Sequence, residues 1–184
     1  QGFFAWTGPD SLDDRLYELD LASSLSTVVE TVSEDLLAFS IKMRLDAADH
    51  DCALDAAAAV FQMLRMIREE GVTVERYEER RRMLSMRDRM RQKSARDIAS
   101  EAVSSACMGE YDADTITALL DVLSVENVSV LSTLPPDEPF IYWNREPFYK
   151  SAYTALHMRE EHVSALRQIR DFELRLPPLY PTVG

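Results

Sequence analysis

The sequence predicts an all-α protein built of antiparallel helical hairpins, arranged as a bundle or a short irregular helical-repeat array. Apolar residues recur at three- and four-residue spacing along most of the 184 positions, and the alternation typical of strands is nearly absent. Serine, threonine or aspartate stands ahead of several of these stretches, where a helix N-cap is expected. With 46% hydrophobic residues and only 5 glycines, the chain can bury a core of its own.

The first part of the chain is expected to contain three helices. Ser11 caps the first helix, a second helix covers residues 31–45, and a third ends at Gly71, a residue suited to the position after a helix. The second and third helices are expected to pair as an antiparallel hairpin. Phe61 and Leu64 lie in the middle of the apolar stripe and are expected to be buried.

Three more helices are expected before residue 128. Thr73 caps a strongly charged fourth helix, and a fifth runs from about residue 94 to Gly109. A sixth covers residues 112–123, and the fifth and sixth form a second hairpin.

These patterns divide the chain into four regions. Residues 1–127 form the helical hairpin region, and residues 128–147 form an ordered connector rich in proline and aromatic residues. Residues 148–175 form a C-terminal helix or helical hairpin. Residues 176–184 contain three prolines, so they are expected to be extended and to dock on a surface with Tyr180 as the anchor.

The charge of the chain is strongly acidic and unevenly distributed. The formal net charge is −12, which opposes binding to phosphates, yet the segment 65–97 holds 11 basic residues against 7 acidic ones. That segment is either a solvated helix with its own ion pairs or a surface for an acidic or phosphate-bearing partner. Arginine outnumbers lysine 17 to 3, which suits contacts with partners but also fits the codon bias of a GC-rich genome.

Contacts with partners are expected from arginines of the basic segment and from aromatic residues near the prolines. Aromatic residues in such surroundings serve either as core residues or as anchors between subunits. The candidate partner-binding residues are Arg76, Arg80, Arg81, Arg82, Arg87, Trp143 and Tyr180.

No catalytic, metal or cofactor site is expected. His50, Asp51 and Cys52 are metal-ligand types, but the second ligand pair that zinc requires and the glycine that a calcium loop requires are absent around them. His157 and His162 are five residues apart, so on one helix they point in different directions. The sequence contains no nucleophile, phosphate-loop or dinucleotide motif, and we therefore expect a protein that is not an enzyme.

Three stretches resemble the helical hairpins of the pentatricopeptide and tetratricopeptide families. The first covers residues 41–61 and closes with Met66-Ile-Arg-Glu-Glu-Gly-Val72; the others cover residues 99–123 and 149–178. As an acidic chain with helical hairpins and no membrane span, the chain is also similar to the peripheral, matrix-side helical subunit of cytochrome c oxidase. The resemblance implies helical hairpins that present a contact surface.

We expect a non-enzymatic interaction protein or structural subunit of a larger complex, with other protein subunits as partners. The alternative is an RNA-binding helical-repeat protein that uses residues 76–96 against phosphates. The chain starts at Gln1 without an initiator Met, as either a processed chain or an excised fragment does. A processed chain would be imported into an organelle such as the mitochondrion, which is the expected compartment, with the cytoplasm as the alternative. No apolar stretch reaches the length of a membrane span.

Overall fold

The fold is mixed α/β, so the prediction of an all-α helical-repeat protein is wrong. The computed structural model describes residues 3–4, 6–33, 36–47, 50–90, 113–131, 133, 144–155, 157–168 and 170–179. In chain order the elements are α1 (Leu12–Glu18), β1 (Ala22–Ser33), β2 (Leu36–Leu45), α2 (His50–Glu70), α3 (Val74–Met90), α5 (Ala113–Val122), the 3-10 turn η1 (Val125–Asn127), β3 (Asn144–Arg145), β4 (Ala152–Tyr153) and α6 (Glu160–Arg167). The strands form two separate antiparallel pairs, β1 with β2 and β3 with β4.

Strands β1 and β2 form a long hairpin where the second helix was expected. In β2 the half-buried Phe39, Ile41 and Met43 alternate with polar residues, and of these Lys42 and Arg44 are exposed. This two-residue period places the apolar side chains on one face of a strand, and no helix could do so. The expected pairing of two helices, and the helical-repeat resemblance that begins at residue 41, are therefore wrong.

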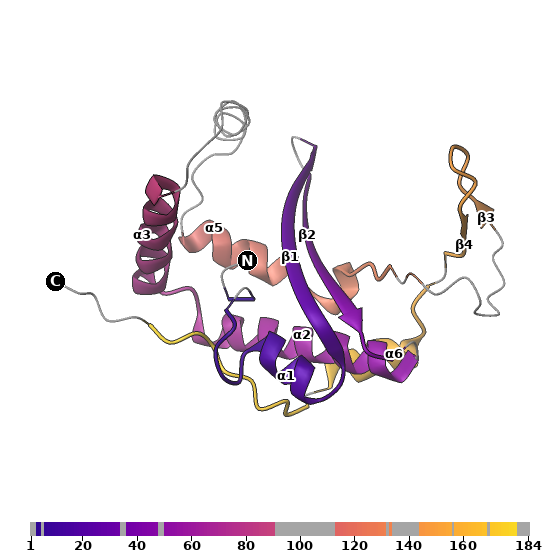
Figure 1. Ribbon diagram of the computed structural model, residues 1–184, viewed down its shortest axis with the longest axis horizontal. Helices are drawn as coiled ribbons and strands as arrows, with labels where there is room; N and C mark the ends of the chain where they lie inside the picture. The colour runs from indigo at the N-terminus through magenta and orange to yellow at the C-terminus, as the bar shows by residue number, and fades with distance from the viewer. Residues whose placement is uncertain are drawn as a thin grey trace.

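Helix α2 is the centre of the core. It contacts α1, α5, α6 and β2, and Figure 1 shows it running beneath the rising β1–β2 hairpin. Met63 is fully buried and Ile67 is 1% exposed, while the small side chains of the alanines before them let neighbouring elements approach. Leu64 is buried as expected, but Phe61 is only half-buried.

Several helix ends agree with the sequence predictions. The Asp14 amide donates to the Ser11 Oγ at 3.2 Å, and the Arg76 amide donates to the Thr73 Oγ1 at 3.3 Å. Gly71 follows α2 with a φ of +79°, a conformation that favours glycine. Helices α3 and α5 occupy the predicted fourth and sixth positions, and the predicted fifth helix lies outside the described residues.

Residues 148–175 differ from the expected C-terminal helix or helical hairpin. Of their described residues, only Glu160–Arg167 are helical; residues 144–153 form the β3–β4 hairpin, and residues 170–179 are extended. The extended conformation therefore starts before the prolines of the tail. No helix in the described part of the chain is long and apolar enough to span a membrane.

Candidate interaction site

The extended residues 170–179, which we call the C-terminal strap, cross the surface formed by α1, α2 and the start of α3 (Figure 1). Phe172 and Leu174 are buried, whereas Glu173 between them and Arg175 after them are exposed, as in a strand that lies on a core. The Phe172 amide donates to the Gln62 Oε1 at 3.2 Å, and the Arg175 amide donates to the Asp10 carbonyl oxygen at 2.8 Å. The strap is thus held by both its side chains and its backbone.

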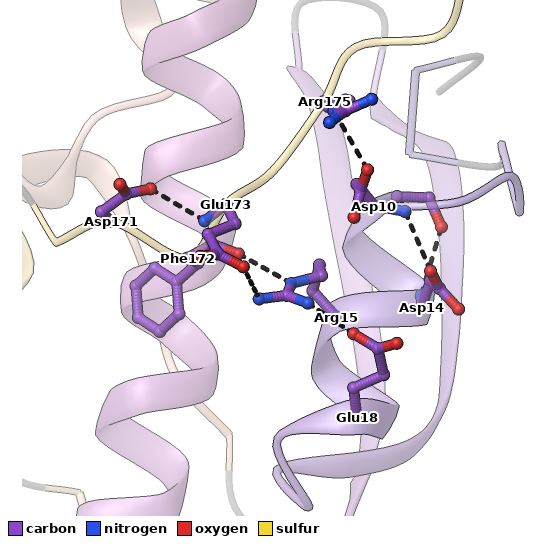
Figure 2. Close-up of polar contacts among 9 residues, drawn as sticks. Asp10, Asp14, Arg15, Glu18, Asp171, Phe172, Glu173 and Arg175 are labelled. Atoms are coloured by element: carbon purple, nitrogen blue, oxygen red, sulfur yellow. Dashed lines mark hydrogen bonds and ion pairs between the residues drawn. The ribbon is translucent and has the colours of Figure 1, made fainter.

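Arg15 of α1 fixes the middle of the strap (Figure 2). Its Nε donates to the Phe172 carbonyl oxygen at 3.0 Å, and its two terminal nitrogens lie 2.5 Å from carboxylate oxygens of Glu18 and Glu173. Burial acts against the charged form, but the hydrogen bond to Glu18 and the nearby carboxylates raise the pKa of Arg15 above its ordinary value. Arg175 of the strap in turn pairs with Asp10, with its Nε 3.0 Å from the Asp10 Oδ2.

A groove of about 570 Å³ lies between the end of α2, the start of α3 and the strap. Its lining combines five apolar residues with two glutamates and two arginines. The lining residues are Met66, Glu69, Glu70, Arg76, Leu174, Arg175, Leu176, Pro177 and Pro178.

Arg76, one of the candidate partner-binding residues, makes its contacts within the chain at this groove. Its Nη1 donates to the Pro177 carbonyl oxygen at 2.7 Å, and its Nε donates to the Glu70 Oε1 at 2.9 Å. The guanidinium carbon lies 5.7 Å from the centre of the Phe3 ring, within the range of a cation–π contact. The side chain is only 12% exposed, so Arg76 joins the strap to α2, α3 and the N-terminal residues.

The other candidate residues are spread along α3 or lie outside the described residues. Arg80 is half-buried; the Arg81 Nη1 lies 3.8 Å from the Glu78 Oε1, and the Arg82 Nε donates to the Glu78 carbonyl oxygen. Arg87 belongs to α3, but its side chain is not among those that the structure describes. Trp143 and Tyr180 lie outside the described residues. The described structure therefore gathers no cluster of these seven residues.

Two further arginines, both on α2, bind the ends of other helices. The Arg65 Nη2 donates to the carbonyl oxygen of Arg167, the last residue of α6, at 3.2 Å. The Arg68 Nε donates to the Leu120 carbonyl oxygen in the last turn of α5 at 3.1 Å. Helix C-termini carry unpaired carbonyl oxygens and a partial negative charge, which suits a guanidinium group.

The histidine and cysteine positions are separate from these contacts. Among the described residues no group of three or more His, Cys, Asp and Glu side chains is placed to hold a metal ion. The Cys52 thiol is buried and donates to the Leu21 carbonyl oxygen at 3.3 Å. His157 precedes α6 and His162 lies within it, 3.5 Å from the Glu161 Oε1, so the two histidines do not share one helix as assumed from the sequence.

Neither a protein-family model nor a curated protein sequence matches the chain. A solved structure does match: the crystal structure of pitrilysin superposes with a TM-score of 0.70 and 17% sequence identity, over 99% of this chain and 21% of the pitrilysin chain. Pitrilysin is a peptidase and not a helical-repeat protein, so the resemblance to pentatricopeptide and tetratricopeptide hairpins, and to the cytochrome c oxidase subunit, is wrong. The chain is similar in fold to about one fifth of pitrilysin.

Proposed function

We propose that this chain is a non-catalytic interaction domain that works as one part of a larger protein with a pitrilysin-like architecture. The observation that supports the proposal is the extent of the superposition. Nearly the whole chain superposes on a part of pitrilysin that makes up only 21% of the pitrilysin chain. A domain of this kind holds other parts of the protein by protein–protein contacts.

The distribution of exposed apolar side chains supports contacts with other protein surfaces. Large apolar residues that are more than half exposed lie on several elements. Such residues are ordinary when they are scattered singly, but Val130 with Leu131 and Phe148 with Tyr149 are exposed as adjacent pairs, which favours contact with another protein surface. The large apolar residues that are more than half exposed are Tyr17, Val74, Met86, Val122, Val130, Leu131, Phe148 and Tyr149. The formal net charge of −12 favours a protein partner over RNA.

The test compares residues 1–184 with the full-length product of the same gene. Cross-linking followed by mass spectrometry of the full-length product is expected to join Lys42 or Lys150 to residues outside this region. The isolated chain is expected neither to hydrolyse a protein substrate such as casein nor to bind RNA at physiological salt. A full-length product without such cross-links, chelator-sensitive hydrolysis, or tight RNA binding would each overturn the proposal.

A further inference from the structure

The turn of the β3–β4 hairpin carries two aromatic side chains that face solvent. Phe148 is 84% exposed and Tyr149 is 89% exposed, and Tyr153 on β4 is 48% exposed. Figure 1 shows this hairpin standing away from the helices of the molecule. Such large aromatic surface is uncommon on a single turn, and aromatic residues are enriched where proteins bind one another.

The turn is held in one conformation by its own hydrogen bonds. The Phe148 and Tyr149 amides donate to the two carboxylate oxygens of Glu146, at 2.7 and 2.6 Å. The Lys150 amide donates to the Glu146 carbonyl oxygen at 3.1 Å, and the Glu146 amide donates to the Ser151 carbonyl oxygen at 2.9 Å. Binding through this turn therefore requires little further ordering of the backbone, which lowers the entropic cost of association.

The charges around the aromatic pair are predominantly positive. The Glu146 carboxylate is occupied by the two amides, while Arg145 and Lys150 flank the pair without an ion pair in the described part of the chain. The Lys150 Nζ donates to the Pro147 carbonyl oxygen, at 2.7 Å. An aromatic and cationic turn thus projects from a chain whose net charge is −12.

We infer that residues 146–151 anchor this domain to another domain of the same polypeptide. The complementary surface is an apolar pocket for Phe148 and Tyr149 with carboxylates at its rim to pair with Arg145 and Lys150. The inference rests on the proposed function, because it requires the chain to be part of a larger protein.

The first experiment is hydroxyl-radical footprinting with mass spectrometry, on the isolated residues 1–184 and on the full-length product. Phe148 and Tyr149 are expected to react strongly in the isolated chain and severalfold less in the full-length product. Loss of reactivity elsewhere in residues 1–184, with Phe148 and Tyr149 unchanged, would overturn the inference but leave the proposed function in place. Equal reactivity of every residue in both proteins would overturn the proposed function itself.

The second experiment uses variants of the full-length product. The double variant Phe148→Ala, Tyr149→Ala is expected to raise hydrogen exchange at the contact, and Glu146→Ala is expected to do so more weakly because it frees the turn. The matched control is Tyr17→Ala, an aromatic that is 68% exposed on α1 and is expected to leave exchange unchanged. An unchanged exchange pattern in the double variant would contradict the inference.

A lipid surface is the outcome that must be separated from a protein partner. Because the aromatic pair lies between two cations, vesicles of phosphatidylcholine and phosphatidylserine serve as the probe in a flotation assay. The isolated chain is expected to remain unbound, since its net charge repels anionic lipid. Flotation that the double variant abolishes would overturn the protein-docking inference.

Discussion

Arg15 and Phe172 are 157 positions apart in the sequence, and a 3.0 Å hydrogen bond joins the Nε of the first to the carbonyl oxygen of the second. This bond connects the first helix to the C-terminal strap, the last described segment of the chain. The two ion pairs of the same guanidinium, to Glu18 and Glu173, reinforce it. Arg15 therefore ties the two ends of the described chain to one another.

Replacing Arg15 by alanine is expected to lower the free energy of unfolding by more than the loss of an exposed ion pair does, because the variant loses the hydrogen bond to the Phe172 carbonyl oxygen and both ion pairs. Arg15→Lys is expected to recover only part of this loss, because an ammonium group cannot reproduce the planar set of donors. Urea unfolding curves measure both variants. Arg81→Ala is the control, since its ion pair is long and exposed, and its effect is expected to stay below about 0.5 kcal/mol. Equal effects of the two alanine variants would show that the strap does not depend on Arg15.

Met63→Ala is expected to destabilise the fold by about 2–5 kcal/mol, because this side chain is fully buried in the centre of α2. Met86→Ala on α3 is the matched control: its side chain is 61% exposed, and the expected change is within about 0.5 kcal/mol. Thermal and chemical unfolding of the two variants, compared with the parent chain, measure the difference. A loss at Met63 no larger than that at Met86 would place the core elsewhere.

Gly71→Ala is expected to cost about 1–2 kcal/mol, because an alanine at positive φ is strained. A Cβ atom at Gly71 would meet no other atom within 4 Å, so the cost is conformational and not steric crowding by neighbours. Gly71→Asn is expected to be less destabilising than Gly71→Ala, since asparagine tolerates this conformation better. The order of the two variants in an unfolding experiment tests the assignment, and the reverse order would contradict it.

Glu126 is expected to titrate far below the ordinary value of 4.5. A hydrogen bond from the Ser124 side chain, then one from its own backbone amide and one from Arg167, lower its pKa to about 2. Because the folded-state pKa is depressed, the stabilising contribution is present above about pH 4.5 and is lost as the pH falls toward 2. Carboxyl NMR titration measures it directly. Ser124→Ala and Arg167→Ala are each expected to raise this pKa, and a titration near 4.5 in the parent chain would refute the assignment.

The sequence carried enough information for the central helices but was misread at β2. Residues 36–45 contain Phe39, Ile41, Met43 and Leu45, an unbroken two-residue period that indicates a strand. A helix would instead place its apolar residues three and four positions apart. Helices α2 and α3 were predictable because a glycine and a capping threonine mark their boundary.

The contacts of the candidate site are harder to predict from the sequence than the helices are. The arginine excess pointed to guanidinium groups with specific contacts, but the groups that receive them are backbone carbonyl oxygens on distant elements. Every residue has such an oxygen, so no sequence pattern marks the partners of Arg15, Arg65 or Arg76. Only the folded chain identifies them.

Because the acceptors of these arginines are backbone carbonyl oxygens, the arginines and the acceptor residues differ in the substitutions that they can tolerate. When a guanidinium binds a backbone carbonyl oxygen, the residue that supplies the oxygen can change its side chain without losing the bond, whereas the arginine cannot be replaced so freely. Deep mutational scanning is therefore expected to be asymmetric for these hydrogen bonds: substitutions of Arg65 and Arg68 should remove them, while a new side chain at the acceptors Arg167 and Leu120 should leave them in place and act only through the contacts of the acceptor's own side chain. The hydrogen bonds of Arg65 and Arg68 can therefore persist in relatives whose acceptor residues carry different side chains.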